Sequence, residues 1–426
     1  MQILTEPSAL ALVDVDDLVY PDGSRIARRL FYDQDVYEAE RTRIFQRCWL
    51  FVGHESQIPN PGDFVTSYMG EEPVIVSRAK DGSIHVVVNS CSHRATRICN
   101  VDCGNATTLT CPYHGWQFGI DGRLLGVPSF RLYDGGLDKS SRGLHQARVE
   151  TYLGLIFATF DHDAQSLAEY LGDDYRYYLE ALFDRDGDGT AVLGGIQRWR
   201  IDCNWKMPSE NLAGDMYHPD VSHASVMQLS GEASADIEPA MQVTSSSGHA
   251  IIVRTRPDDR DGTTYPGSGK LEREWFDSVQ PKVRTRLGET RARLGIIAGN
   301  VFPNFSFVPQ MFTIRVSHPR GPGSTEMWSY CLVPAAAPAE VRATLVSGYQ
   351  RVFGPGGMVE SEDGDNWVGM TAGAACARTD DRPLHVGLGL GSEYTSKEYP
   401  GSLAPLISEH NQRGFWKTWR RWVAGA

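Results

Sequence analysis

Two short segments combine cysteine and histidine at spacings that suit metal binding. Cys91 and His93 form a C-x-H pair, and Cys111 and His114 form a C-x-x-H pair after a gap of 17 residues. A thiolate and a neutral imidazole from each segment suit a structural zinc, or a [2Fe–2S] cluster in which two cysteines hold one iron and two histidines hold the other. Zinc sites rarely split into two such mixed pairs, so the pattern favours the cluster.

The neighbouring residues also favour an iron–sulfur cluster. Pro112, Gly115 and Trp116 surround the second pair, as expected of a tight loop that covers a cluster with backbone N–H groups. Neutral imidazoles make the cluster less negative than thiolates would, and this raises its reduction potential. Such a centre accepts electrons from a ferredoxin and passes them on. Cys99 and Cys103, between the two pairs, are interpreted as small, partly buried thiols.

A second group of metal-binding residue types follows later in the chain. His218 and His223 are five positions apart, and Asp215 comes three before the first of them. On a regular helix, positions i and i+5 differ by about 140°, so one regular helix does not aim both imidazoles at one metal. Pro219 supplies a reason for a bent or ending helix. Two histidines and one carboxylate form the facial triad of non-haem Fe(II) oxygenases, which leaves positions open for O2.

Short β-strands are expected to carry the two Cys/His loops. Apolar residues at 74–77 and 84–89 flank an Asp81-Gly82 turn, and the second strand runs directly into Cys91. Further strands are expected over 108–110, 116–120 and 153–160. These predict a small antiparallel β-domain over residues 41–160. Helices are expected over 33–48 and 167–183.

Length and composition limit the kind of protein. The 426 residues are enough for two or three domains, and the net charge of −12 argues against nucleic acid as a partner. No run of 18 apolar residues predicts a membrane span, and no signal peptide is expected. Eight cysteines do not form a disulfide framework, which predicts a cytoplasmic location. Lys417, Arg420 and Arg421 lie among tryptophans, and suit either a docking patch or the solvated face of an amphipathic helix.

Longer motifs carry a resemblance to a known family. The chain contains PGDFVTSYMGEEPVIVSR before the first pair, CSHRATR and CPYHGW at the pairs, NWKMPSENLAGDMYHPDVSH at the histidines, and FGPGGMVESEDGDNWV near the end. It resembles the large (alpha) subunit of Rieske non-haem iron ring-hydroxylating dioxygenases, in particular the biphenyl, toluene and naphthalene types. The resemblance implies an α+β fold: a small all-β Rieske [2Fe–2S] domain over 41–160, and a catalytic domain over 161–426 with an antiparallel sheet and surrounding helices. Residues 1–40 are expected to form an N-terminal helical segment packed on the catalytic domain.

The resemblance also implies roles for single residues. Cys91, His93, Cys111 and His114 would hold the Rieske cluster, and His218, His223 and Asp363 would hold a mononuclear Fe(II). Glu362 is an adjacent acid that leaves a one-residue shift open. Asp215 would link His218 to His114 of a neighbouring subunit, and Asn211 and Tyr217 would lie near the iron ligands.

The implied reaction adds both atoms of O2 to an aromatic ring and gives a cis-dihydrodiol. Electrons would come from NAD(P)H through a reductase and a ferredoxin, and a small beta subunit would complete an α3β3 hexamer. The substrate is expected to be a hydrophobic mono- or polycyclic arene, with the pocket formed by Leu212, Gly214, Met216, Val301, Phe307 and Phe353.

Alternative functions remain open at this point. An aromatic carboxylate such as a phthalate-like acid would need a buried cation, which Arg254 or Arg256 could supply. A Rieske monooxygenase or demethylase would use the same iron centres. A zinc-stabilised or electron-transfer protein without catalytic activity would not need His218, His223 and Asp363.

Overall fold

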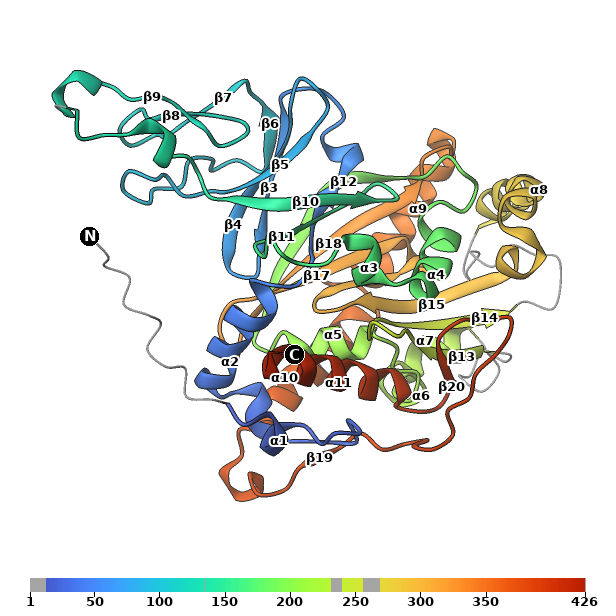
Figure 1. The fold of residues 1–426 in the computed structure, drawn as a ribbon. Coiled ribbons are helices and arrows are strands. Elements are labelled where there is room, and N and C mark those ends of the chain that lie inside the picture. The colour runs from blue at the N-terminus through green and yellow to red at the C-terminus, as the bar shows by residue number, and fades with distance from the viewer. Residues whose placement is uncertain (1–12, 134, 231–239, 256–268, 426) are drawn as a thin grey trace. The chain divides into compact units, whose positions relative to one another are not determined.

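The structure, a computed structural model, describes residues 13–133, 135–230, 240–255 and 269–425. It divides into two compact units (Figure 1): a small unit, Phe45–Leu167, and a large unit made of Met1–Ile44 and Ala168–Ala426. In the part of the chain that is described, every helix falls short of the length and apolar character that a membrane crossing requires.

The small unit is built from antiparallel strands. Seven strands pair in the order β2-β11-β10-β5-β4-β3-β6, and three more pair as β7-β8-β9. Their bounds are β2 Leu50–His54, β3 Asp63–Met69, β4 Glu72–Arg78, β5 Ile84–Val88, β6 Cys103–Asn105, β7 Thr108–Thr110, β8 Gln117–Gly119, β9 Leu124–Gly126, β10 Gln146–Tyr152 and β11 Leu155–Thr159. The predicted hairpin around Asp81-Gly82 is confirmed, because β4 and β5 pair in register on either side of it.

An eight-stranded antiparallel sheet forms the centre of the large unit, in the order β12-β18-β17-β16-β15-β14-β13-β20. The strands are β12 Thr190–Ile201, β13 Ala240–Thr244, β14 Ala250–Thr255, β15 Leu294–Val301, β16 Phe305–Val308, β17 Thr313–Pro319, β18 Thr325–Pro334 and β20 Ser402–Pro405, and β1 Arg25–Ile26 pairs separately with β19 Leu384–His385. The helices are α1 Val15–Leu18, α2 Gln34–Glu40, α3 Leu167–Leu171, α4 Asp173–Phe183, α5 Lys206–Leu212, α6 Pro219–Ser222, α7 Ala224–Ser230, α8 Lys270–Ala292, α9 Ala339–Phe353, α10 Glu360–Ala374 and α11 His410–Ala424. The α+β class is as predicted.

Alternation along β16 shows which helices cover which face of this sheet. Phe307 packs against Phe183 of α4, with their ring centroids 5.6 Å apart. Its neighbour Val308 packs instead in a cluster with Leu212 of α5. Successive side chains of a strand point to opposite faces, so α4 and α5 cover opposite sides of the sheet.

Two of the predicted helices are interrupted. The helix expected over 33–48 is α-helical only over Gln34–Glu40, and a π-helical turn over Arg41–Phe45 ends it. The helix expected over 167–183 is two helices, because Gly172 has a φ of 75° and an α-helix cannot continue through the left-handed region.

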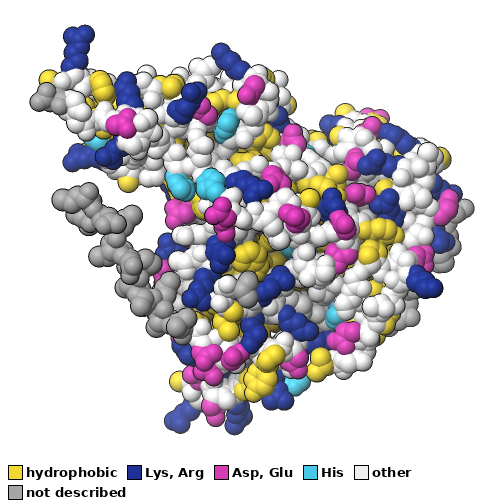
Figure 2. Space-filling model, viewed as in Figure 1, with side chains coloured by type: hydrophobic (Ala, Val, Ile, Leu, Met, Phe, Trp, Pro, Cys, Tyr) yellow, Lys and Arg dark blue, Asp and Glu magenta, His cyan; other side chains and the backbone are white. Residues whose placement is uncertain are grey.

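The basic residues near the C-terminus lie on helix α11, whose packing distinguishes the two interpretations of them. Trp416 and Trp419 are fully buried, Arg420 pairs with Asp16, and Arg421 donates to the carbonyl of Ser247. The helix is therefore amphipathic, and two of its cations are engaged within the large unit. Acidic and basic side chains are interspersed over the face of this unit that Figure 2 shows.

Candidate metal centres

The large unit brings two histidines together by placing them at either end of a one-turn helix. His218 is the residue before α6, His223 is the residue after it, and Pro219 is the first residue of that helix. Proline is well tolerated at a first helical position, where its missing N–H has no partner to lose. Neither histidine lies within regular helix, and this is how two positions five apart face the same point.

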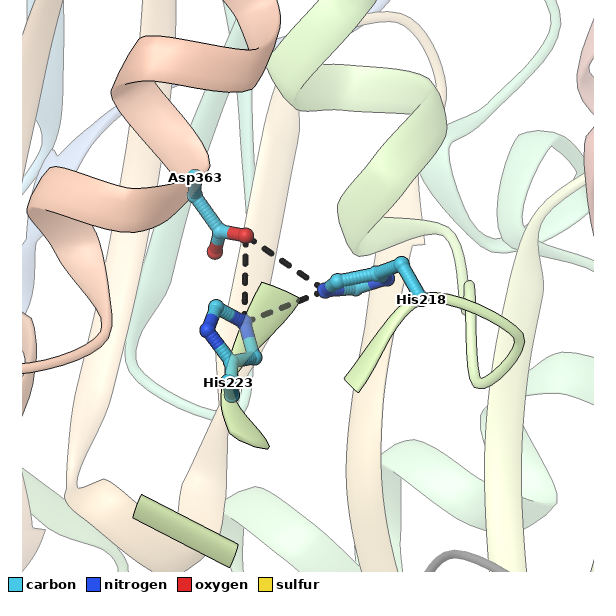
Figure 3. Close-up of side chains that lie close together, drawn as sticks. All are labelled: His218, His223 and Asp363. Atoms are coloured by element: carbon cyan, nitrogen blue, oxygen red, sulfur yellow. Dashed lines mark hydrogen bonds and ion pairs between the residues drawn. The ribbon is translucent and has the colours of Figure 1, made fainter. Parts of the chain in front are cut away.

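Asp363, in the first turn of α10, completes a compact triad (Figure 3). The Nε2 atoms of His218 and His223 are 3.1 Å apart, and they lie 3.4 Å and 3.2 Å from Oδ1 of Asp363. A metal about 2.1 Å from two donor atoms at right angles separates those atoms by about 3.0 Å. The donor set and its spacing therefore fit one metal ion bound on three neighbouring positions.

Each imidazole has a carboxylate at its other ring nitrogen. Asp215 Oδ2 lies 3.3 Å from Nδ1 of His218, and Asn211 Nδ2 lies 3.4 Å from the same atom. Glu362 Oε2 lies 2.7 Å from Nδ1 of His223. Such partners fix the tautomer and orientation of metal-binding histidines. Glu362, which sequence had left open as a ligand, lies on the side of His223 that faces away from Asp363.

The carboxylates make this site attractive to a cation. Burial lowers the pKa of His218, but hydrogen bonds to Asp215 and Asp363 outweigh it and raise the pKa to about 10. In Asp363, burial raises the pKa, but the two histidines outweigh it and the net shift is downward. A buried carboxylate that stays ionised beside two imidazoles is a suitable environment for a divalent metal.

The small unit presents its two Cys/His pairs on loops of matching geometry. In the first loop the N–H of Ala95 donates to the carbonyl of Cys91, and in the second the N–H of Gly115 donates to that of Cys111. Ala95 and Gly115 both adopt positive φ values, 59° and 70°. Each loop thus turns back at the same point and presents its cysteine and histidine on one side.

The four side chains of these loops fit an iron–sulfur cluster. Cys91 and Cys111 are buried, and the rings of His93 and His114 have centroids 4.6 Å apart. The Nδ1 atoms of both histidines are buried and lack a hydrogen-bond partner among the described residues. Burial raises the pKa of Cys91, the backbone N–H groups of His93 and Arg94 lower it, and the nearby Cys111 raises it further. Two close thiols and two unpartnered imidazole nitrogens form a consistent ligand set for such a cluster.

An apolar cluster includes residues that directly follow Asn211 and directly precede α10 in the chain. Leu212, which follows Asn211 on α5, packs with Val308, Val352 and Phe353. Ala298, Met311 and Val359 pack against this cluster, and Val359 directly precedes α10. We call these seven residues the apolar cluster. Of the six predicted pocket residues, the structure brings Leu212 and Phe353 together here.

The other four predicted pocket residues lie elsewhere. Val301 pairs with Phe305, and Phe305 and Phe307 pack near Phe183, so Val301 and Phe307 occupy the opposite face of the sheet. Adjacent strand residues alternate between faces, so the structure does not bring these two residues into the apolar cluster.

Met216 and Gly214 also lie outside the apolar cluster. Met216 packs with Ile252 and Leu406 rather than with the apolar cluster. Gly214 has a φ of 136°, and a Cβ there would lie 2.6 Å from both Asn411 and Ile252. Its small size therefore reflects close packing and positive φ, and not room for a substrate.

Several site residues were missed from sequence. Val308 and Ala298 follow from strand alternation once the register is known, but sequence does not say which face carries the iron ligands. Glu362 was noticed only as a possible ligand. Arg254, proposed for a carboxylated substrate, lies on β14, and Arg256 falls outside the described residues.

Comparison with known proteins agrees with both centres. Residues 48–135 match the family described as Rieske [2Fe-2S] domain, and residues 169–425 match Ring hydroxylating alpha subunit (catalytic domain). The chain is 38% identical to the biphenyl dioxygenase subunit alpha of Metapseudomonas furukawaii, with 96% of this chain and 92% of that protein covered. It is 36% identical to a benzene 1,2-dioxygenase subunit alpha of Pseudomonas putida, with 96% and 93% covered. A structure of naphthalene 1,2-dioxygenase with indole bound in the active site superposes with a TM-score of 0.88 at 35% identity, with 96% and 94% covered.

The chain therefore belongs to the family of ring-hydroxylating dioxygenase alpha subunits. It is an oxidoreductase whose cofactors are a Rieske [2Fe–2S] cluster and a mononuclear iron. Because the chain belongs to this family, the alternatives of a zinc-stabilised protein and of a simple electron carrier are excluded.

Proposed function

We propose that this chain dihydroxylates a hydrophobic aromatic ring, with His218, His223 and Asp363 holding the iron and with Cys91, His93, Cys111 and His114 holding the cluster. The observation that carries the proposal is the triad of ligand atoms 3.1–3.4 Å apart. The two metal centres, when bound, supply the electrons and the O2 activation that convert an arene, O2, two electrons and two protons into a cis-dihydrodiol.

The protein residues have defined tasks in this reaction. Asp215 and Glu362 each accept from Nδ1 of one histidine and so orient both Nε2 atoms toward the metal, which would displace the proton that the metal-free imidazole carries. The side-chain amide of Asn211 lies 3.4 Å from the same Nδ1 atom of His218. Asp363 contributes the charge, and its burial keeps water from competing for it.

The apolar cluster supports an uncharged arene as substrate. Its seven members carry no charge, and they begin at Leu212 and Val359, next to the elements that hold the triad. A ring placed against Phe353 gains from burial and from aromatic contact. Arg315 is a buried cation near the apolar cluster, but its charge is already neutralised by Glu360. An aromatic carboxylate is therefore the less favoured substrate.

Electrons are proposed to reach the cluster from NAD(P)H through a reductase and a ferredoxin, and a small beta subunit is proposed to complete an α3β3 hexamer. Transfer between the centres is proposed to run from His114 of one copy to Asp215 of the next. Exposure supports this route: the side chain of Asp215 is 29% exposed, and its neighbour Tyr217 and the loop residue Tyr113 are 60% and 58% exposed.

The test combines metal analysis with product analysis. The purified chain, reduced with dithionite, is expected to give the rhombic EPR signal of a Rieske cluster and to contain three irons and two sulfides per chain. His223→Ala should lose the mononuclear iron and keep the cluster signal, whereas His410→Asn, at a buried histidine that contacts the carbonyl of Ser402, should keep both.

Turnover with a reductase and ferredoxin under 18O2 then separates the reactions. A cis-diol that carries two labelled oxygens supports dioxygenation. A single labelled hydroxyl, or loss of a methyl group, would establish the monooxygenase or demethylase alternative. Zinc in place of iron, with no sulfide, would overturn the proposal altogether.

A further inference from the structure

Arg315 is a buried charge at the point where the apolar cluster meets the iron-binding helix. It lies on β17 with its side chain fully buried. Nη2 donates to the backbone carbonyl of Phe353 at 3.1 Å and also to Oε2 of Glu360. The guanidinium carbon is 4.7 Å from the ring centroid of Phe353. One planar cation thus touches both the ring and the carbonyl of Phe353.

The two residues that Arg315 contacts lie at the end of one helix and at the start of the next. Phe353 is the last residue of α9 and a member of the apolar cluster. Glu360 is the first residue of α10, and Asp363 follows three positions later. With a rise of 1.5 Å per residue, about 4.5 Å of helix axis separates Glu360 from Asp363. A guanidinium that fixes Glu360 therefore fixes the turn of helix that presents the iron-binding carboxylate.

Stability alone does not explain a pair of this kind. Removing two charges from water is unfavourable, and well-packed apolar residues often serve stability equally well. Nε and Nη1 of Arg315 and Oγ of Ser306 are buried and lack hydrogen-bond partners among the described residues. Ser306 faces Arg315 across β16 and β17. One side of the ion pair therefore has unsatisfied hydrogen-bonding groups, and ordered water can bind to them.

We propose that Arg315 is a positioning residue that couples the packing of an arene against the apolar cluster to the position of Asp363 at the iron. The proposal rests on the proposed function above. An arene packed against Phe353 presses on the ring and carbonyl that Arg315 holds, and Glu360 passes the displacement to α10. Substrate thereby sets the ligand geometry before O2 is reduced.

Loss of this coupling has a balanced chemical consequence. Without it, two electrons and two protons reduce O2 to hydrogen peroxide, and the arene is left unchanged. Because misplacement by about 1 Å can cost about 100-fold in rate, we expect product formed per O2 consumed to fall by about tenfold or more.

Three variants separate positioning from general damage. Arg315→Lys keeps the charge but loses the guanidinium plane that lies over the Phe353 ring and the Nη2 group that donates to both acceptors. Arg315→Met combined with Glu360→Gln removes both charges and leaves no lone ion buried. Arg413→Lys is the matched control, because Arg413 is also buried and donates to a glutamate, Glu393, and to the carbonyl of Leu388, outside the triad and the apolar cluster.

The readout that does not depend on turnover is the EPR signal of the ferrous–nitric oxide complex, recorded with and without an arene such as naphthalene or biphenyl. Wild type and the Arg413 control should change their signal when the arene binds. Both Arg315 variants should retain the wild-type melting temperature within a few degrees, lose the arene-induced change, and release hydrogen peroxide. Loss of iron from a folded Arg315 variant would also support positioning.

An arene-induced change and a product yield like those of wild type in the double variant would overturn the proposal. Unfolding of the double variant, with Arg315→Lys behaving as wild type, would equally overturn it and leave the pair a structural feature. If wild type itself bound no iron, or showed no response to any arene, the proposed function would fail first, so the two failures are distinguishable.

Discussion

Protons and metal compete for the triad, and this gives a measurable pH dependence. In the metal-free protein, burial lowers the pKa of His218, but Asp215 and Asp363 raise it to about 10. At pH 7 the imidazole therefore carries a proton that Fe(II) must displace. His223 shifts in the same direction, because Asp363 and Glu362 outweigh the effect of burial.

The size of the pH dependence of Fe(II) binding follows from the raised pKa of His218. Three pH units between pH 7 and a pKa of about 10 correspond to about 4 kcal/mol of deprotonation cost at 1.36 kcal/mol per unit. Fe(II) affinity should rise about tenfold per pH unit from pH 6 to 9 for the proton on His218, and more steeply wherever His223 is also protonated. Stability of the metal-free fold should follow the opposite trend. A raised folded-state pKa stabilises fully below about 6.5, and this stabilisation is lost as pH rises toward 10.

Asp215→Asn tests the cause directly. Removing one of the two carboxylates that raise the pKa of His218 should shift the steep part of the affinity curve to lower pH. Anaerobic calorimetry with Fe(II), in buffers of different protonation enthalpy, counts the protons released. Asp380→Asn is the control, since Asp380 is an exposed acceptor for the hydroxyl of Tyr32. An affinity that does not vary with pH, or superimposable curves for Asp215→Asn and wild type, would refute the reasoning.

Three further predictions concern single contacts. Ala95→Gly should stabilise the small unit by about 0.5–1 kcal/mol. A non-glycine residue in the left-handed region costs about 1–2 kcal/mol, and the greater chain entropy of glycine in the unfolded state offsets part of the gain. Differential scanning calorimetry of the holoprotein measures this change in stability. Glu362→Ala should weaken iron binding by about 10- to 100-fold, because Nδ1 of His223 loses its carboxylate, as equilibrium dialysis against a chelator would show. Lys206→Met leaves the fully buried carboxylate of Glu40 unpaired and should cost about 3–5 kcal/mol, a fall of about 5 °C in melting temperature.

Matched variants make these outcomes specific. Gly115→Ala should shift stability in the opposite direction to Ala95→Gly, and equal signs would contradict the strain argument. Asp365→Asn, at an exposed position of α10, should leave iron binding unchanged, and an effect as large as that of Glu362→Ala would point to general loss of charge. Adding Glu40→Gln to Lys206→Met should recover part of the stability, since the lone charge disappears while an acceptor remains for two indole N–H groups.

The chain sequence alone was enough to identify residues that lie close together along it. The two Cys/His loops each span a few residues, so their spacing specifies the geometry, and the strands that carry them were predicted from local turns and apolar runs. The bend between His218 and His223 was also foreseeable, because Pro219 acts on its immediate neighbours. Helix continuity was predicted wrongly, because Gly172 and the π-helical turn at Arg41–Phe45 interrupt two helices that were expected to be continuous.

Tertiary structure decided everything that joins distant segments. His223 and Glu362 are 139 positions apart, and only the fold shows that Glu362 serves the outer nitrogen while Asp363 faces both histidines. The same holds for the ion pair of Arg315 and Glu360. Sequence could not show that Val301 and Phe307 lie on the opposite face of the sheet from Leu212, because side chains alternate with a period of two and the sheet's register decides which face meets α5. Local patterns encode ligand types and loops, whereas packing between strands and helices selects their neighbours.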